Sequence, residues 1–455
     1  MKLTFWEAAE AVKATNDWKQ WADFTLTGLE FDSRLITSGN LFVPLKGAND
    51  GHSFITSAVE KGASASFWSS EVEPPAALPV LKVSDTLKAM QDLAVYYLKK
   101  MTPTVIAITG SNGKTTTKDM TEAVLAQQFN TYKTQGNYNN DIGLPYTILH
   151  MPDETEKLIL EMGMDHAHEI DFLSTLARPE VAAITMIGEA HIENLGSRAG
   201  IAAAKMEITA GLSAQGLLLI PAEEPLLVPL IKELPQTIQT FGWQQADCQA
   251  EIESEQKEQT SFKINGSDRL FTIPVPGKYN VGNALIAISI GRWFEIPEEK
   301  IQAGLASFKL TKNRTEWLKT PQGTEILSDV YNANPTAMNL VLESFAQMPT
   351  SGKRVAVLGD MLELGPDSAK MHASVSEHLN PNEISEVVLY GTEMKALFNV
   401  LKDKYPKEQL HYFTKEEKEL LIEQLQSLVN PEDMIVMKAS NGMGLNAIVE
   451  QLMKS

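Results

Sequence analysis

Short apolar runs alternate with helical patterns along the whole chain, and this alternation predicts an α/β fold. Runs such as "VIAIT" (105–109) and "EVVLY" (386–390) are typical of strands buried in a parallel sheet. After the first of these runs, Met120, Val124 and Leu125 fall on one face of a helix. Strands and helices that follow one another in this way are typical of proteins built around parallel sheets.

The pattern divides the chain into three segments, which we expect to be domains. In 1–101, "LFVPL" and "ASASFW" predict strands, and "SFITSAVEKGA" predicts a helix that ends at Gly62, so a small α/β domain is expected. The segment 102–312 predicts a mostly parallel sheet. The segment 313–455 repeats strand-then-loop units ("RVAVLGDMLELG", "EVVLYGTEM", "DMIVMKASNGMG"), which predict an open, Rossmann-like sheet.

Composition narrows the classes of function and location. The 455 residues carry a net charge of −19, which argues against a nucleic-acid-binding face and against attraction to anionic membranes. Cys248 is the only cysteine, so an internal disulfide is excluded and a reducing compartment fits. The first residues predict an amphipathic helix rather than a signal peptide, and no apolar run is long enough to span a membrane. We therefore expect a cytoplasmic protein.

The stretch "TGSNGKTTTK" (109–118) predicts a phosphate-binding loop of unusual spacing. Only two residues separate its first two glycines, whereas the common motif has four. It still follows a predicted strand and opens a helix, the context in which backbone N–H groups bind phosphate. Lys114 would supply a positive charge and Thr115 a hydroxyl for Mg²⁺. The alternative is an ordinary turn with a chance lysine, but the flanking elements favour a nucleoside triphosphate site.

Further polar residues follow neighbouring strand patterns. "KLILE" ends at Glu161 and "EVAAITMIGEAH" ends at His191, so both are expected at the sheet edge that carries the loop. Each alone has a plain alternative, a solvated carboxylate and a structural histidine. His166 and His168 suggest zinc by their spacing, but no cysteine lies nearby, and we interpret them as loop or helix-start residues. Lys205, on a helical pattern, has a solvated lysine as its alternative.

The order of eight stretches resembles the Mur ligases. They are "TGSNGKTTTK", "GNYNNDIGLP", "EMGMDHAHEI", "GEAHIENLGS", "AKMEI", "GKYNVGNALIAIS", "DVYNANPTAM" and "LGDMLELG", and they span essentially the whole chain. "YNANP" and "LGDMLELG" are most similar to the family member that adds a dipeptide. "FDSR" and "LFVPLKGANDGH" are similar to the uridine-nucleotide domain of the same family.

The resemblance implies a three-domain ligase: a UDP-binding N-terminal domain, a central P-loop-type ATPase domain and a C-terminal Rossmann-like domain. It implies that D-alanyl-D-alanine is joined to UDP-N-acetylmuramoyl-tripeptide through an acyl phosphate, with ATP and Mg²⁺, during peptidoglycan precursor synthesis. No nucleic acid or membrane partner is implied, and we expect a monomer. Whether the third residue of the tripeptide is lysine or diaminopimelate stays open.

The resemblance also implies roles for individual residues. ATP would be bound by Gly110, Ser111, Asn112, Gly113, Lys114, Thr115, Thr116, Asn283, Arg314 and Asp329. The metal ligands would be Thr115, Glu161, His191 and Lys205, the last as a carbamate, and Lys114, Glu161, His191 and Lys205 would be catalytic. The substrate-binding residues would be Ser33 and Arg34 for the uridine diphosphate, and Asn332 and Asp360, within 359–363, for the dipeptide.

A charge argument supports the carbamate at Lys205. An unmodified lysine would place a positive charge beside Mg²⁺, whereas a neutral amine can add carbon dioxide and become an oxygen ligand.

Two positions depart from the family pattern, and two other functions remain possible. Met186 stands where relatives often have Asn, and Asn441 where they often have Arg, so the roles of these positions are open. A folylpolyglutamate synthase would have a similar loop, but it lacks the N-terminal domain indicated by "FDSR" and "KGANDGH". An ATP-binding switch without ligase chemistry would not require Glu161, His191 and Lys205 together.

Overall fold

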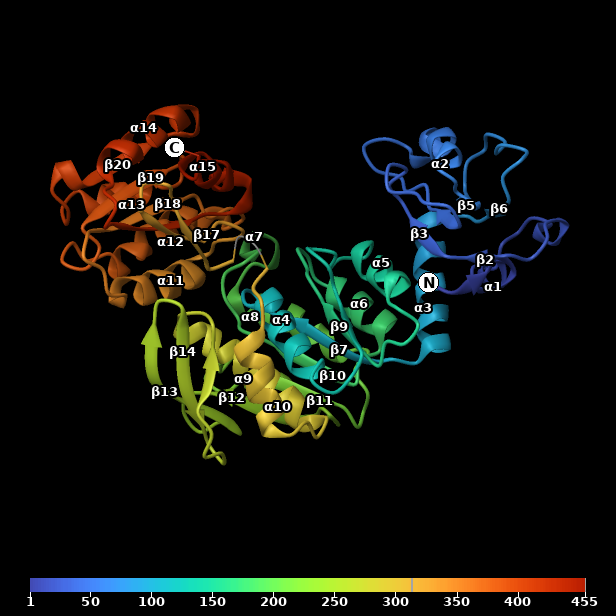
Figure 1. Cartoon of the computed structure of the whole chain (residues 1–455), viewed down its shortest axis with the longest axis horizontal. Helices are drawn as coiled ribbons and strands as arrows, with labels where there is room; N and C mark the ends of the chain where they lie inside the picture. The colour runs from blue at the N-terminus through green and yellow to red at the C-terminus, as the bar shows by residue number, and fades with distance from the viewer. Residues whose placement is uncertain (312–313, 455) are drawn as a thin grey trace.

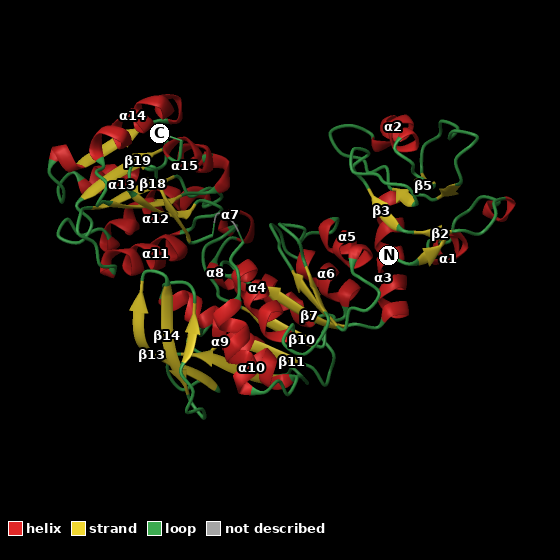
Figure 2. Ribbon diagram, viewed as in Figure 1, coloured by secondary structure: helices red, strands yellow, loops and turns green. Residues whose placement is uncertain are grey.

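The computed structural model describes residues 1–311 and 314–454. It has the predicted α/β architecture in three domains, each built on its own sheet, with the N-terminal domain in blue and the C-terminal domain in orange to red (Figure 1). Helices flank the sheets of all three (Figure 2). The predicted boundary between 312 and 313 lies outside the described residues, and the ranges 1–101, 102–312 and 313–455 stay predictions.

The N-terminal domain contains a parallel four-stranded sheet, and the predicted runs "LFVPL" and "ASASFW" contribute to two of its strands. The strand order is β3 (Gly28–Glu30), β4 (Asn40–Phe42), β5 (Ala65–Trp68) and β6 (Val80–Lys82). An antiparallel pair lies beside it, β1 (Leu3–Thr4) and β2 (Thr25–Leu26). The helices are α1 (Phe5–Ala11), α2 (Ile55–Glu60) and α3 (Thr86–Met101). Gly62 follows α2 at a φ of +100°, so the predicted helix end is confirmed.

The central domain is built on a nine-stranded sheet. Its order is β15 (Phe271–Ile273), β14 (Gln259–Ile264), β13 (Cys248–Gln256), β12 (Thr237–Gly242), β11 (Leu217–Pro221), β10 (Val181–Ile184), β7 (Thr104–Thr109), β9 (Lys157–Glu161) and β8 (Thr131–Lys133). Strands β8 to β13 pair in parallel, and β13, β14 and β15 pair antiparallel. Because β7 lies between β10 and β9, their carboxyl ends bring the loop, Glu161 and the start of the 185–191 segment to one edge.

Helices cover both faces of this sheet. They are α4 (Lys114–Leu125), α5 (Gly143–His150), α6 (Glu169–Ala177), α7 (Ile192–Leu195), α8 (Arg198–Met206), α9 (Lys278–Trp293) and α10 (Glu298–Ser307). On one face, Met120 and Val124 of α4 share a buried cluster with Ile106 of β7, Leu285 of α9 and Ile301 of α10. The predicted apolar face of the helix after the loop is therefore confirmed.

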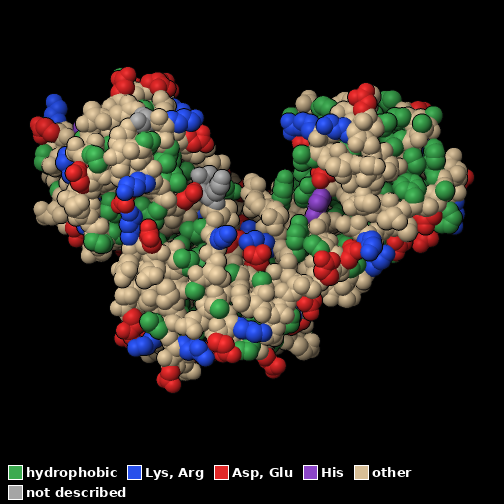
Figure 3. Space-filling model, viewed as in Figure 1, with side chains coloured by type: hydrophobic (Ala, Val, Ile, Leu, Met, Phe, Trp, Pro, Cys, Tyr) green, Lys and Arg blue, Asp and Glu red, His purple; other side chains and the backbone are tan. Residues whose placement is uncertain are grey.

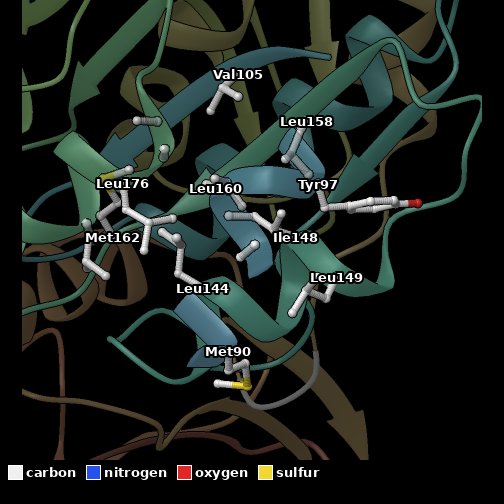
Figure 4. Packing of buried hydrophobic residues seen from close by; sticks show 14 of the residues in the cluster. Met90, Tyr97, Val105, Leu144, Ile148, Leu149, Leu158, Leu160, Met162 and Leu176 are labelled. Atoms are coloured by element: carbon white, nitrogen blue, oxygen red, sulfur yellow. The ribbon is translucent and has the colours of Figure 1, made fainter. Parts of the chain in front are cut away.

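The other face of the central sheet shares its core with the N-terminal domain. Leu41 of β4, Tyr97 of α3, Leu144 of α5 and Leu158 of β9 belong to one continuous buried cluster, and all four are fully buried. Figure 4 shows Met90 and Tyr97 beside the apolar side chains that α5 and β9 contribute. Helix α3 is thus the common wall of the two domains.

The C-terminal domain is a six-stranded sheet with one antiparallel edge. Its order is β16 (Glu316–Lys319), β17 (Glu325–Asp329), β21 (Met434–Lys438), β18 (Arg354–Gly359), β19 (Glu386–Tyr390) and β20 (Leu410–Phe413), and only β16 runs antiparallel to its neighbour. Its helices are α11 (Pro335–Gln347), α12 (Ser368–Ser374), α13 (Lys395–Leu401), α14 (Lys418–Leu428) and α15 (Leu445–Leu452). Among residues 1–311 and 314–454, no helix has the length and apolar character needed to cross a membrane.

Candidate active site

The phosphate loop folds tightly where β7 meets α4, and its glycines permit this. Gly113 has a φ of +81° and precedes the first residue of α4, Lys114. A Cβ on Gly113 would lie 2.4 Å from Oδ1 of Asn283, and one on Gly110 would lie 1.7 Å from Oγ1 of Thr185. Both positions therefore exclude larger residues, and the start of α4 presents its free N–H groups at the loop.

The loop is held by hydrogen bonds with the segment after β10. The N–H of Ser111 donates to the carbonyl of Met186 at 2.9 Å, and the N–H of Gly188 donates to Oγ of Ser111 at 2.9 Å. Thr185 donates to the carbonyl of Asn112. Because Met186 contributes its carbonyl, this contact does not depend on its side chain, and the departure from the family pattern leaves it intact.

Glu161 is a buried carboxylate surrounded by donors. Oγ1 of Thr115 donates to its Oε2 at 2.9 Å, Nδ2 of Asn139 donates to its Oε1 at 2.9 Å, and Nζ of Lys118 lies 3.7 Å from Oε2. Burial raises the pKa of Glu161, but the positive charges of Lys118, Lys114 and Arg314 outweigh it and hold the pKa below its ordinary value. Glu161 is therefore an ionised carboxylate, and its oxygens lie beside the hydroxyl of Thr115.

Two lysines near the loop have lowered pKa values: Lys114 is half-buried and Lys205 is fully buried. Nζ of Lys114 donates to the carbonyl of Gly110 at 2.8 Å, and burial lowers its pKa. Lys205 on α8 is 2% exposed. Burial, together with the charge of Lys114, lowers the pKa of Lys205 well below its ordinary value. Its amine makes no hydrogen bond or ion pair with the described residues, and Lys205 does not line the cavities below.

His191 faces the carboxylates of Glu363 and Asp165 rather than that of Glu161. Its Nδ1 lies 2.5 Å from Oε2 of Glu363, in the C-terminal domain, and 3.3 Å from Oδ1 of Asp165. Within the described part of the chain, no three His, Cys, Asp or Glu side chains are grouped closely enough to hold a metal ion. His168 precedes α6 directly and His166 lies in the loop before it, as expected of loop and helix-start residues.

Two adjoining cavities meet at the loop. One, of about 380 Å³, is lined by Asn112, Gly113, Thr116, Thr185, Met186, Phe241, Trp243, Lys278, Asn283, Arg314, Asp329 and Asn332, among others. The second, of about 300 Å³, is lined by Ser111, Lys114, Asn137, Asn139, Glu161, Asp165, His191, Arg314, Asn332, Glu363 and Asn441, among others. The C-terminal domain thus contributes Arg314 and Asn332 to both cavities. A third cavity, of about 610 Å³, continues from the second along Asn137, Asn139 and Asp165.

The structure brings some predicted residues to this site and places others elsewhere. The guanidinium of Arg314 lies 3.9 Å from the ring centroid of Tyr331, and Asp329 pairs with Lys438 at 2.5 Å. Asp360 is buried away from the cavities, and its Oδ1 accepts the N–H of Met394 at 2.9 Å.

The two residues predicted to hold the uridine diphosphate also lie outside the three cavities. Ser33 is buried in the N-terminal domain, and Arg34 is exposed there, 2.7 Å from Asp32.

Sequence reasoning missed several side chains at the site. Lys118 and Asn139 contact Glu161, and Trp243 lies at the carboxyl end of β12, where Lys278 sits 4.4 Å from its ring centroid. A signal was present for Lys118, since it follows Lys114 by four residues and so shares its helix face. Trp243 could have been found from its position just after a parallel strand.

Comparison with known proteins agrees with this arrangement. Three family models match: the Mur ligase family, catalytic domain at 25–97, the Mur ligase middle domain at 108–291, and the Mur ligase, glutamate ligase domain at 313–441. The UDP-N-acetylmuramoyl-tripeptide–D-alanyl-D-alanine ligase of Bacillus subtilis (strain 168) is 42% identical over 100% of this chain and 99% of its own length. The chain belongs to the Mur ligase family. The enzyme of the same name from Escherichia coli (strain K12) is 35% identical to this Mur ligase over 83% of the chain and 84% of its own length.

Solved structures support the same family. MurF from Acinetobacter baumannii superposes with a TM-score of 0.89 at 29% identity, over 100% of this Mur ligase and 99% of that chain. MurF ligase from Thermotoga maritima, solved in complex with ADP, has a TM-score of 0.82 at 26% identity over 97% and 99% of the two chains. A folylpolyglutamate synthase from Mycobacterium tuberculosis shares only the fold, at 15% identity and a TM-score of 0.59.

Proposed function

We propose that this Mur ligase joins D-alanyl-D-alanine to UDP-N-acetylmuramoyl-tripeptide and converts ATP to ADP and phosphate. The observation that carries the proposal is the 42% identity, over the full length of both chains, to a ligase of that name. The paired cavities at the phosphate loop support it, because one can take a nucleotide and the other a reacting carboxylate. The N-terminal domain (1–101) would bind the uridine diphosphate and the central domain (102–312) would bind ATP. The C-terminal domain (313–455) would supply residues to the nucleotide from the side opposite the phosphate loop.

The loop and the cavity of about 380 Å³ supply what ATP requires. The N–H groups at the start of α4 and the charge of Lys114 would bind its phosphates. Asn283, 7% exposed beside the loop, would approach the adenine, and Trp243 would provide an aromatic wall. Arg314 would add a second positive charge from the C-terminal domain. A relative solved with ADP supports this use of the nucleotide.

The donors near the loop fit Mg²⁺. The hydroxyl of Thr115 and the ionised carboxylate of Glu161 are hard oxygen ligands 2.9 Å apart. Mg²⁺ bound there would neutralise charge on the transferring phosphoryl group. For a second ion we propose Glu161, His191 and Lys205 as a carbamate. The burial and lack of partners of the Lys205 amine support a neutral amine, which is the form that reacts with carbon dioxide.

The chemistry would proceed in two displacements. An oxygen of the tripeptide's terminal carboxylate attacks the γ-phosphorus of ATP. The bond between this phosphorus and the bridging oxygen breaks, and ADP leaves with its electron pair. The amine of D-alanyl-D-alanine then attacks the acyl carbon and loses a proton, and phosphate departs with the electron pair of its C–O bond. Lys114 and Arg314 would orient the phosphoryl group and balance its charge, which positions both reactants without covalent help from the protein.

The test measures ADP release with each substrate omitted in turn. We expect rapid release only with ATP, UDP-N-acetylmuramoyl-tripeptide and D-alanyl-D-alanine all present, together with a ligated product of the expected mass. A preference for a single amino acid over the dipeptide would assign the chain to another ligase of the family. Rapid ADP release without the tripeptide would contradict the proposal. The use of ATP also leads us to propose a cytoplasmic location, and a monomeric state stays a prediction.

A further inference from the structure

The carboxylate of Asp119 joins the ATP-loop helix to the segment that leads into the C-terminal domain. Asp119 lies on α4, five residues after Lys114, and is 3% exposed. Its Oδ2 accepts both the N–H of Thr311, at 3.2 Å, and the hydroxyl of Thr311, at 2.8 Å. Its Oδ1 accepts Nζ of Lys133 at 2.8 Å. Both oxygens are therefore occupied, and a buried charge with this many donors holds its partners strongly.

Thr311 is close in the chain to the cation that the C-terminal domain sends to the site. Arg314 follows Thr311 by three positions in the chain, so a fixed Thr311 confines the Arg314 backbone to within about 11 Å. Arg314 lines both cavities at the loop, and its charge acts on Lys114 and Glu161. The residue after Arg314 is also held, because the N–H of Thr315 donates to Oδ1 of Asp329 at 3.4 Å.

We infer that Asp119 is a positioning residue: by holding Thr311, it sets Arg314 against the bound nucleotide. Helix α4, which would bind the phosphates at its start, would thus also fix the backbone from which Arg314 reaches them. This inference rests on the proposed function, since it assigns Arg314 to the nucleotide. In this inference, Asp119 acts through its hydrogen bonds with Thr311. Its contact with Lys133 is shared with Glu122, so a substitution of Glu122 serves as the control.

The test is ADP affinity, measured by calorimetry on the full-length protein with Mg²⁺. We expect Asp119→Asn and Thr311→Val each to weaken ADP binding by about 5- to 10-fold, because each removes a charge-assisted hydrogen bond. Thr311→Ser, which keeps the hydroxyl, should bind ADP as the native chain does. In an Arg314→Ala background the same two substitutions should change ADP affinity by less than about twofold, because residues that act through one group are not additive.

Glu122→Gln is the matched control. Glu122 lies on the same helix and accepts Nζ of Lys133 at 2.9 Å, but among the described residues Thr311 donates its hydrogen bonds to Asp119 and not to Glu122. It should leave ADP affinity unchanged, and an equal loss there would overturn the inference. So would full additivity with Arg314→Ala, or native ADP affinity in Arg314→Ala alone. Thr311 is only partly buried, so Thr311→Val tests the idea even if Asp119→Asn fails to fold. Absence of ligation by the native chain would refute the proposed function without affecting these affinities.

Discussion

The two junctions of the central domain are built from opposite materials. At the N-terminal junction, Leu93 and Tyr97 of α3 are fully buried in the same cluster as Leu144 and Ile148 of α5. At the C-terminal junction, the contacts near the site are polar: Nδ2 of Asn334 donates to Oδ1 of Asn112 at 3.1 Å.

More polar contacts lie along the C-terminal junction. The N–H and the hydroxyl of Thr336 donate to Oε2 of Glu189 at 3.1 and 2.8 Å. The N–H of Glu193 donates to the carbonyl of Glu363 at 3.1 Å. Apolar contact there is limited, with Ile192 and Tyr279 packed at the edge of the C-terminal core.

This difference indicates which junction can open. Separating α3 from α5 would expose a continuous apolar core, whereas the polar contacts at the other junction can be exchanged for water at a small net cost. The open notch between the N- and C-terminal domains leaves room for such motion (Figure 3). The exchangeable contacts involve Asn112 of the loop and Glu189 beside it. If ATP binds at the loop as we propose, nucleotide binding and domain position would be linked by these shared residues.

The largest effect should come from the nucleotide side, at Lys114. Lys114→Ala should reduce ligation by about 1,000-fold or more, because it removes the cation that we propose at the transferring phosphate. The thermal midpoint should stay close to that of the native chain, since the apolar junction is untouched. Lys99→Ala, at an exposed position of α3, is the control and should retain full turnover. Near-native ligation by a folded Lys114→Ala protein would remove the loop from the mechanism.

The apolar junction should be most sensitive at Leu144. Leu144→Ala should lower the free energy of unfolding by about 2–5 kcal/mol, because the side chain is fully buried between α3 and the central sheet. Urea denaturation measures this loss. The matched change Leu420→Ala, at a leucine that is 52% exposed, should cost less than about 0.5 kcal/mol. Equal costs for the two variants would mean that α3 and α5 do not share a core.

Acid should lower the free energy of unfolding by protonating Glu161 beside the phosphate loop. The pKa of Glu161 in the folded protein is held below its ordinary value by the charges of Lys118, Lys114 and Arg314, which outweigh burial. Its contribution to stability is therefore complete above the unfolded pKa of about 4.3 and is lost as pH falls through the folded value. The stability difference between the native chain and Glu161→Gln should shrink across that range in urea titrations at several pH values. A difference that is constant with pH would mean that Glu161 is neutral in the fold.

The smallest effect should come from the polar junction, at Thr336. Thr336→Val removes one hydrogen bond to Glu189, so we expect a change of less than about 1 kcal/mol in the free energy of unfolding. The KM for ATP should rise a few-fold, because the C-terminal domain would spend less time at the loop, and small-angle scattering should report a larger radius without nucleotide. Thr336→Ser keeps the hydroxyl and should match the native chain. A large loss of stability instead would contradict the contrast between the junctions.

Local features of the sequence determined the scaffold of the site. The apolar run before "TGSNGKTTTK" and the helical pattern after it correspond to β7 and α4, and the run "KLILE" is β9, which ends at Glu161. Such patterns can be interpreted from neighbouring residues because strand and helix periodicities repeat over short distances. Since the carboxyl ends of parallel strands meet at one edge, the position of Glu161 relative to the loop followed as well.

Only the tertiary structure decided which polar groups meet. Asn112 and Asn334 are 222 residues apart in sequence, and Asp119 and Thr311 are 192 apart. The sequence places Lys118 on the helix face of Lys114, but its burial, at 1% exposed, comes from the packing of α4 against β8 and β9. Asp360 was expected at the site, but its carboxylate turns to the N–H of Met394 instead. Apolar periodicity is a property of adjacent residues, whereas a buried hydrogen bond depends on the orientation of two side chains that distant packing brings within 3 Å of each other.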